Sequence, residues 1–492
     1  MKKLSYDVLR EINYQEYLLE SAPERILQFG EGNFLRGFVN YFVDLMNEKA
    51  GFNSKTVVVQ PIAAGLADMI NEQDGLYTLY LRGMENGQKV NRKRVISNIS
   101  RCLNPYNEYK KILELASSPE LRYIVSNTTE AGIVFEEDST FDQEPPASFP
   151  AKLTRFLFER YQQGLPGFII LSCELIDNNG QELKKCVDKY ITHWQLPEAF
   201  AGWVESENVF CSTLVDRIVT GYPRPEAEAL NQENGYIDNL IDTAEVFGFW
   251  VIEGPDSLKQ ELPVAEAGLP VIIVDDHSPY KQRKVRILNG AHTSMIMAAY
   301  LAGQNIVREC MDDETIREFM NRTIYEEIIP TLTLPEAELK EFAASVTERF
   351  ANPFIDHSLL AISLNSISKW RARVMPSLLG FCQNTSTLPP CITLSFAAML
   401  AFYSRGEELH EDHLLARRDG ETYQIKDDRW VLEFFYENRG SSPLELTALV
   451  AANTKMWGRD LSELTGFVDQ VSKYLKMIRE DGMRKVLEEV LA

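Results

Sequence analysis

The chain has 492 residues, of which 45% are hydrophobic and 25% are charged, and its formal net charge is −22. A chain of this length is too long for a single core, so two or three domains are expected. The acidic balance argues against bulk attraction to nucleic acid or to an anionic membrane surface, and neither is an expected partner. An anionic small molecule would therefore need a local cationic pocket.

The cysteines and the N-terminus point to a reducing compartment. The chain has seven cysteines, which are scattered and show no C-x2-C spacing, so reduced thiols are expected. Residues Met1 to Asp7 lack the apolar core of a signal peptide, and no later stretch has the length of a bilayer span. No long heptad pattern indicates a coiled coil. We expect a cytoplasmic protein that is a monomer or a small homo-oligomer.

The first half alternates between strand and helix patterns. Arg25–Phe29 is an apolar run that ends at a glycine turn, Gly30–Gly37, and Phe38–Met46 follows with helical periodicity. The β-branched run Thr56–Gln60 suits a strand buried on both faces of a parallel sheet. Later runs of the same kind are Tyr123–Ser126 and Gly167–Cys173. The pattern predicts an α/β fold with a doubly wound sheet.

The glycine turn has the features of a dinucleotide site. Small residues let the backbone approach a pyrophosphate, and the following helix offers its free N–H groups and its dipole. The pattern departs from G-x-G-x-x-G, because Leu35 stands at the third glycine position. Gln60 replaces the usual acidic residue after the second strand, and no basic cluster lies beside it, which favours NAD over NADP. The predicted cofactor contacts here are Phe29, Gly30, Glu31, Gly32, Asn33, Phe34, Arg36 and Gln60.

The second half is mostly amphipathic and helical after Val271–Asp276. Helices are expected at 291–303, 314–328, 335–350, 391–404, 443–455 and 460–490. Residues 405–428 are rich in charged residues and predict a solvated excursion between helices. The spacing of His410 and His413 could suit a metal, but a solvated charged loop is the interpretation we favour, and no metal site is expected.

The stretch from Lys284 to His292 gathers a base, an amide and an imidazole within nine residues. In a helix, Lys284, Leu288 and His292 lie along one side, and Asn289 stands three residues before His292. A lysine can protonate the oxygen of a ketone that accepts hydride, while Asn and His donors hold that oxygen, and no metal is needed. The alternative is a surface lysine, a helix-capping asparagine and a histidine at the edge of the core.

The chain resembles the long-chain mannitol dehydrogenase-like polyol and sugar-acid dehydrogenases over nearly its whole length. The residues that carry the resemblance are Gly30–Arg36, Thr128–Gly132, Ser172–Glu174, Val215–Ile218, Phe249–Glu253 and Lys284–His292. The resemblance implies that Lys284 is the general acid/base and that Asn289 and His292 bind the reacting oxygen. It adds Thr128 and Glu130 to the cofactor contacts. It also implies a Rossmann-type NAD-binding domain, residues 1–283, and a helical substrate domain, residues 284–492.

One departure from the family bears on the substrate. Hexitol and fructuronate enzymes of this family carry Ser-Cys-Asp-Asn, whereas this chain has Leu175 at the last position, and leucine cannot donate a hydrogen bond. Either Asn178 supplies the donor or the subgroup works without it. The surrounding sequence is similar to the tagaturonate reductase branch, which implies NAD-dependent interconversion of a keto-uronate and an aldonate.

A uronate carboxylate calls for a cationic partner, and Lys369–Arg373 is the densest basic cluster of the helical half. Arg371 or Arg373 is the predicted partner, and a solvated helix face is the alternative. Other functions remain open at this point: fructuronate reductase, a mannitol-type polyol dehydrogenase, or an NAD-binding regulator without turnover. A zinc-dependent polyol dehydrogenase would need a ligand set that the sequence does not offer.

Overall fold

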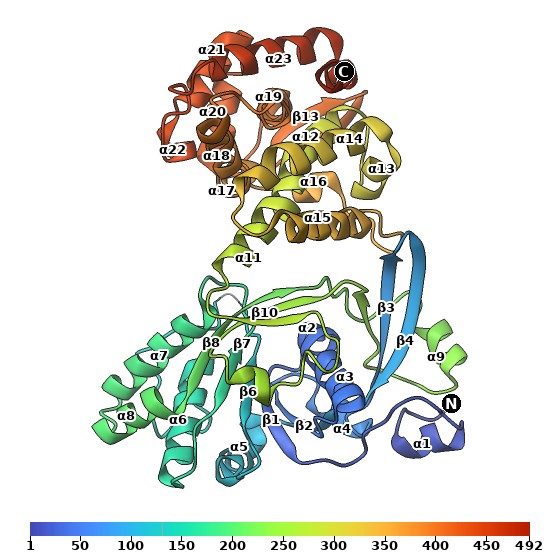
Figure 1. The fold of residues 1–492 in the computed structure, drawn as a ribbon, viewed down its shortest axis with the longest axis vertical. Coiled ribbons are helices and arrows are strands. Elements are labelled where there is room, and N and C mark those ends of the chain that lie inside the picture. The colour runs from blue at the N-terminus through green and yellow to red at the C-terminus, as the bar shows by residue number, and fades with distance from the viewer. Residues whose placement is uncertain (130) are drawn as a thin grey trace. The chain divides into compact units, whose positions relative to one another are not determined.

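The computed structural model describes residues 1–129 and 131–492. The chain forms two compact units (Figure 1). The first unit comprises Met1–Gly83 and Val90–His277, and the second comprises Met84–Lys89 and Ser278–Ala492. Within the described ranges, no helix combines the length and the apolar character that a bilayer crossing requires.

An eight-stranded sheet with the order β11-β10-β8-β7-β6-β1-β2-β5 organises the first unit. Its strands are β1 (Glu24–Phe29), β2 (Lys55–Val59), β5 (Ile99–Leu103), β6 (Tyr123–Ser126), β7 (Ile169–Ser172), β8 (Val209–Asp216), β10 (Phe249–Glu253) and β11 (Val271–Val274). The strands from β5 to β8 run parallel in the Rossmann order 3-2-1-4-5-6. The predicted doubly wound sheet is therefore confirmed. The sequence did not anticipate that β10 pairs antiparallel with β8 and carries β11 beside it.

Helices cover both faces of this sheet, because alternate strand residues feed two separate cores. Ile26 and Val125 join one core with Phe38 and Phe42, which belong to the helix after β1. The alternate residues of the same strands join another core, with side chains of α6 and α7. In Figure 1 the strands lie between α2 and α3 on one side and α6 and α7 on the other. The helices of this unit are α1 (Tyr6–Glu11), α2 (Asn33–Leu35), η1 (Arg36–Asn40), α3 (Tyr41–Ala50), α4 (Ala67–Glu72), α5 (Pro105–Glu114), η2 (Leu115–Ser117), α6 (Phe149–Gln162), α7 (Asn179–His193), α8 (Glu198–Glu207), α9 (Ala227–Asn234) and α10 (Leu258–Glu261).

A small second sheet was not predicted. It contains β4 (Gln88–Ile96), β3 (Tyr77–Glu85) and β9 (Asp242–Glu245), in that order. Most of β4 is exposed and charged, so its sequence carries no alternating apolar pattern. The end of β3, the turn and the start of β4, Met84–Lys89, belong to the second unit.

The second unit is mainly helical, as expected. Its centre is α19 (Pro390–Tyr403), which is buried from Cys391 to its end and packs against α12 (Gly290–Leu301) and α23 (Phe467–Asp481). The expected helix at 460–490 is broken at Gly482, whose φ is +86°, so that α24 (Met483–Leu491) follows as a separate helix. The remaining helices are α11 (Ser278–Arg283), η3 (Lys284–Asn289), α13 (Val307–Asp312), α14 (Glu314–Arg322), η4 (Thr323–Ile328), η5 (Ile329–Thr331), α15 (Glu336–Phe350), α16 (Leu359–Ile362), α17 (Ser366–Arg373), α18 (Met375–Thr385), α20 (Arg429–Glu437), α21 (Pro443–Ala451) and α22 (Thr454–Trp457).

The segment at 405–428 lies between helices and is largely exposed, as expected, but it forms a three-stranded antiparallel sheet that was not predicted from the sequence. Its strands are β12 (Gly406–Leu409), β13 (Leu414–Arg418) and β14 (Glu421–Ile425). Leu414 and Ala416 are fully buried and alternate with the half-buried Leu415 and the exposed Arg417. Asp419 and Gly420 both have positive φ and join β13 to β14, as in a two-residue hairpin turn. Asp419-Gly420 is a sequence typical of such turns, and it was overlooked because the segment was interpreted from its charge alone.

Candidate functional site

The glycine turn leaves room for a ligand at the start of the first helix. Gly30 has a φ of +118°, which favours glycine, and a Cβ there would lie 3.3 Å from Leu35 Cδ1. A Cβ at Gly32 would meet nothing within 4 Å, and Gly32 is the N-cap of the helix that begins at Asn33. The first N–H groups of such a helix have no intrahelical acceptor and favour an anion. The turn therefore fits the pyrophosphate of a dinucleotide.

The side chain of Arg36 fixes the glycine turn by hydrogen bonds. Its buried guanidinium donates to Glu31 O at 3.2 Å, to Leu240 O at 2.6 Å and to Asn33 Oδ1 at 2.6 Å. Phe34 stacks on Phe38, with ring centroids 5.1 Å apart. The side chains of Arg36 and Asn33 thus stabilise the backbone of the turn, and that backbone is the part that can face a ligand.

Gln60 plays a similar part after β2. Its Nε2 donates to Ile62 O at 2.6 Å and to Ala63 O at 3.1 Å, while its Oε1 accepts from Ala67 N at 3.0 Å. Glu31 lies against the same loop, because a Cβ at Gly65 would be 2.5 Å from Glu31 Oε1. Burial raises the pKa of Glu31. Gln60 therefore shapes the loop beside the turn, and its amide group is engaged inside the protein.

The segment after β6 completes this edge of the sheet. Asn127 N donates to Phe29 O at 3.4 Å, and Phe29 itself is buried at the end of β1. Thr128 is half-buried, and Glu130, another predicted cofactor contact, lies outside the described residues. Strands β1 and β6 are neighbours whose crossover connections lead in opposite directions, which makes their carboxyl ends the topological switch point of the sheet. Dinucleotides bind at this position in doubly wound folds.

In the second unit, Lys284–Asn289 forms a π-helix rather than the α-helix assumed from the sequence. Gly290 N donates to Val285 O, five residues earlier. This extra residue in the turn brings Lys284 and Asn289 to the same side, whereas the α-helical period favours Lys284 and Leu288. Leu288 is buried instead. Single π-helical turns inside α-helices are frequent at functional sites.

The predicted catalytic residues differ from most of their neighbours along this helix in being partly exposed. From Arg286 to Tyr300, every residue is buried except Asn289 and His292. Lys284 is also partly exposed. We call Lys284, Asn289 and His292 the catalytic strip. The alternative interpretation, with a capping asparagine, does not hold for Asn289, because it lies within a continuous helix and its side chain caps nothing.

The imidazole of His292 is held by aromatic contacts. It stacks on Phe350 with ring centroids 3.8 Å apart, and the ring of His357 is perpendicular to it at 5.6 Å. Its Nε2 is buried and has no hydrogen-bond partner in the described parts of the chain. Burial, and then the nearby charges of His357, Arg349 and Arg373, lower the pKa of His292 well below its usual value. His292 is therefore a neutral imidazole with one nitrogen available to a ligand.

The two predicted carboxylate partners have different surroundings. Arg373 is half-buried, its charge acts on His292, and no hydrogen bond or ion pair joins it to residues 1–129 or 131–492. Burial lowers the pKa of Arg373. Arg371 is exposed and lies over Gly458, where a Cβ would be 2.6 Å from its Nη2. Only Arg373 is thus grouped with the catalytic strip.

The segment around Leu175 is exposed. Leu175 has 67% of its surface accessible, and Asn178 is exposed in the left-handed conformation before α7, with a φ of 52°. The neighbouring amide of Asn179 is buried and donates to Glu174 O at 2.9 Å and to Thr213 O at 3.0 Å. Asn178 therefore has a free surface position, and its substrate role stays a prediction.

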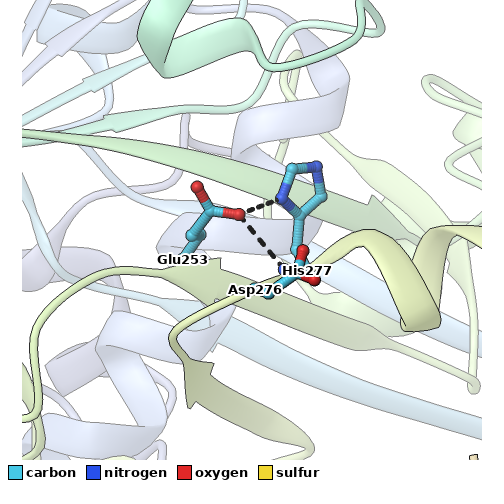
Figure 2. A group of neighbouring side chains, drawn as sticks. All are labelled: Glu253, Asp276 and His277. Atoms are coloured by element: carbon cyan, nitrogen blue, oxygen red, sulfur yellow. Dashed lines mark hydrogen bonds and ion pairs between the residues drawn. The ribbon is translucent and has the colours of Figure 1, made fainter.

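Sequence reasoning missed one group that could hold a metal ion. Glu253, at the end of β10, lies beside Asp276 and His277, with one ligand atom of each within 4.8 Å of the others (Figure 2). Glu253 Oε2 accepts from His277 N at 3.1 Å and lies 2.5 Å from His277 Nδ1. This hydrogen bond engages Nδ1, one of the two ring nitrogens through which His277 could bind a metal, and the group as it stands is a carboxylate–imidazole pair. The separation of 24 positions between Glu253 and His277 gave no recognisable ligand spacing.

Two family models match the chain: the mannitol dehydrogenase Rossmann domain over residues 24–266 and the mannitol dehydrogenase C-terminal domain over residues 276–479. Altronate oxidoreductase of Escherichia coli O7:K1 is 47% identical over 490 residues, 97% of this chain and 99% of that protein. Altronate oxidoreductase of Yersinia enterocolitica is 46% identical over 487 residues, again 97% and 99% of the two chains.

Two solved structures share the fold of the chain at 22% identity. Substrate-free D-sorbitol dehydrogenase has a TM-score of 0.80, with 96% of each chain covered. Mannitol 2-dehydrogenase of Pseudomonas fluorescens, in a ternary complex with NAD and D-mannitol, has a TM-score of 0.68, with 99% of each chain covered. With both family models matched and a relative at 47% identity over almost its whole length, the chain belongs to the mannitol dehydrogenase family.

Proposed function

We propose that this protein is an NAD-dependent altronate oxidoreductase, which interconverts D-altronate and D-tagaturonate in hexuronate catabolism without a metal. The observation that carries the proposal is the catalytic strip, with the half-buried Arg373 beside it. The names of the E. coli and Yersinia relatives support the choice of sugar acid. Small, soluble substrates suit a cytoplasmic monomer or small homo-oligomer.

NADH, when bound, supplies a hydride to the carbonyl carbon of the keto acid. The carbonyl oxygen gains negative charge as this happens, and Lys284 gives it a proton from Nζ to form the alcohol. In the oxidising direction Lys284 takes that proton back. One keto acid, one NADH and one proton thus become one hydroxy acid and one NAD⁺.

Asn289 and His292 hold the reacting oxygen in this proposal. The amide of Asn289 and the neutral imidazole of His292 each offer an N–H donor. Donors that are already fixed in place stabilise the developing charge without reorganising during the reaction. The stacking of His292 on Phe350 fixes its ring plane, and its low pKa makes it a hydrogen-bond donor rather than a proton source at neutral pH.

Arg373 is the proposed partner of the substrate carboxylate. A half-buried guanidinium without an acidic partner loses hydration and gains no compensating ion pair. A carboxylate can supply that pair with two parallel hydrogen bonds. The same contact distinguishes a uronate from an uncharged ketose, whose hydroxyl groups can accept a hydrogen bond but supply no negative charge to pair with Arg373.

The test follows the loss of NADH absorbance with tagaturonate, fructuronate or fructose, with NADPH and a chelator as controls. Rapid oxidation with tagaturonate alone, unaffected by the chelator, is expected. A preference for fructuronate or fructose would refute the substrate while keeping the chemistry. Binding of NADH without oxidation by any sugar would favour the regulator interpretation.

A further inference from the structure

A buried carboxylate lies beneath the segment that follows β6. Glu174 is 2% exposed, and its Oε1 accepts from Thr128 N at 3.1 Å and from Thr128 Oγ1 at 3.3 Å. No lysine or arginine in residues 1–129 or 131–492 forms an ion pair with it. Buried carboxylates are normally paired with a cation. The burial of Glu174 is offset instead by polar neighbours, of which Thr128 makes two hydrogen bonds and the side chain of Ser126 lies nearby.

The segment that Glu174 holds borders the glycine turn. Asn127 N donates to Phe29 O at 3.4 Å, and Asn127 Nδ2 donates to Cys173 O at 2.5 Å. A Cβ at Gly30 would lie 3.5 Å from Asn127 O. The backbone at 127–128 is therefore fixed between the end of β1 and the residues after β7. A shift of Thr128 would change the surface beside the pyrophosphate turn.

Glu174 itself stands on rigid backbone. Its carbonyl accepts from Asn179 Nδ2 at 2.9 Å, and the preceding N–H, that of Cys173, donates to Ser126 O at 2.8 Å. Of the two members of the contact, Glu174 is thus the anchored one and Thr128 the positioned one. Burial raises the pKa of Glu174, and the contacts with Thr128, the side chain of Ser126 and its own backbone N–H oppose that effect.

The burial of the other oxygen of Glu174 costs folding free energy, because that oxygen lacks a hydrogen bond that a purely structural carboxylate would be expected to make. Glu174 Oε2 is buried without a hydrogen-bond partner in the described chain, and so are the hydroxyls of Ser126 and Ser172. Ser126 and Ser172 stand opposite each other in β6 and β7. Buried polar atoms without partners are few in native proteins and require an explanation, such as a functional role.

We propose that Glu174 is a positioning residue of the dinucleotide site, which fixes the segment beside the glycine turn through its two hydrogen bonds with Thr128. NAD(H) rests against that segment, so the loss of Glu174 weakens cofactor binding rather than proton transfer. The inference rests on the proposed function in one respect, the identity of the cofactor. Glu174 touches Thr128 and not the substrate, so it is not a catalytic residue.

The test measures the dissociation constant of NADH, from cofactor fluorescence, for the wild type and three variants. Glu174→Ala removes both acceptor contacts and is expected to raise the constant about tenfold. Glu174→Gln keeps an acceptor for Thr128, and its amide can donate to a serine hydroxyl, so it is expected to stay within about threefold of the wild type. Glu327→Ala is the matched control, since Glu327 is a buried glutamate of the second unit that accepts from Cys391 N and Ile392 N at 2.7 Å each.

A double-mutant cycle identifies the route of the effect. Thr128→Val removes the hydroxyl contact, so its effect on the NADH dissociation constant should not add to that of Glu174→Ala. The KM for the keto acid at saturating NADH should be unchanged. Should Glu174→Ala fail to fold, Glu174→Asp replaces it, because the shorter side chain withdraws the carboxylate from Thr128 and should weaken NADH binding where Gln does not.

The proposal is overturned if Glu174→Ala binds NADH like the wild type, or if Glu327→Ala weakens NADH binding to the same extent. It is also overturned if the effects of Thr128→Val and Glu174→Ala simply add. A wild-type protein that binds NADH but reduces none of the sugars contradicts the proposed reaction alone, and this binding series then still decides the role of Glu174.

Discussion

The glycine turn and the catalytic strip use polar residues in opposite ways. At the turn, the side chains of Arg36 and Gln60 donate hydrogen bonds to backbone carbonyls of the protein, so the backbone is the part that can face a ligand. On the strip, His292 Nε2 is left without a partner among the described residues, and Arg373 stands beside it half-buried. The comparison teaches that substitutions at the turn should act through shape, whereas substitutions on the strip should act through chemistry.

The largest effect is expected on the strip, from Lys284→Met. Loss of the proton donor should lower turnover by roughly two to four orders of magnitude, the usual range for a general acid/base. NADH binding should stay near that of the wild type. Steady-state kinetics and a fluorescence titration check both quantities, with Lys340→Met as the control, because Lys340 forms an exposed ion pair with Glu336. Full turnover in Lys284→Met would refute the proposed role of Lys284 as the general acid/base.

Arg373→Ala should raise the KM for the keto acid by about 10- to 100-fold, since a hydrogen bond to a charged group contributes roughly 1.5–3 kcal/mol. Arg371→Ala is its matched control and should leave this KM unchanged, because Arg371 lies over Gly458. Initial rates across a range of keto acid concentrations separate the two. Equal effects of the two variants would mean that the basic cluster acts only by its overall charge.

Gly32→Ala tests whether the turn acts through shape. Its φ of −63° is allowed for alanine, and the added methyl group would meet no protein atom within 4 Å, so the melting temperature should hardly change. The methyl group would enter the space expected for the pyrophosphate, and the NADH dissociation constant should rise several-fold. Gly30→Ala is the contrasting variant, because its φ of +118° strains alanine and should lower the melting temperature by itself. Unchanged NADH binding in Gly32→Ala would place the cofactor elsewhere.

The smallest effect concerns the pH dependence of stability. The pKa of His292 is lower in the folded protein than in the unfolded chain. Its contribution to stability is therefore present above the unfolded value, about 6.5, and is lost as the pH falls toward the lower folded value. Between pH 7.5 and pH 5, the melting temperature of His292→Phe should fall by less than that of the wild type, as measured by calorimetry. An equal loss in both proteins would mean that His292 is not buried in its neutral form.

Much of the first unit could be predicted because buried parallel strands are short, continuous apolar runs. The runs at β1, β2, β6 and β7 matched the structure within two residues at either end. Strand β4 was not predicted, because its exposed residues are mostly charged. The direction of β10 and β11, which run antiparallel to β8, was not predicted either, because composition does not encode strand direction.

The candidate site was predictable in its residues more than in its geometry. The spacing of Lys284 and His292 suggested a common helix face, but the π-helical turn depends on packing that no local pattern reveals. Glu174 was noticed only as part of a motif, since its contact with Thr128 spans 46 positions in the sequence. The pairing of Glu253 with His277 was missed for the same reason, because Glu253 ends β10 and His277 follows β11, and these strands meet only in the folded sheet.

The π-helical turn at Lys284–Asn289 also has a consequence for how such a site could arise or be lost. A π-helical turn is an α-helix that has accepted one surplus residue. If the same residues wound as an ordinary α-helix, Lys284 and Asn289 would stand about 140° apart, because each residue adds about 100°. The five-residue spacing of the acid and its amide neighbour therefore works only together with the surplus residue of the turn. Deleting one residue between them would leave the two groups four positions apart on one face of an ordinary helix, whereas a substitution that straightened the turn without shortening the chain would separate them.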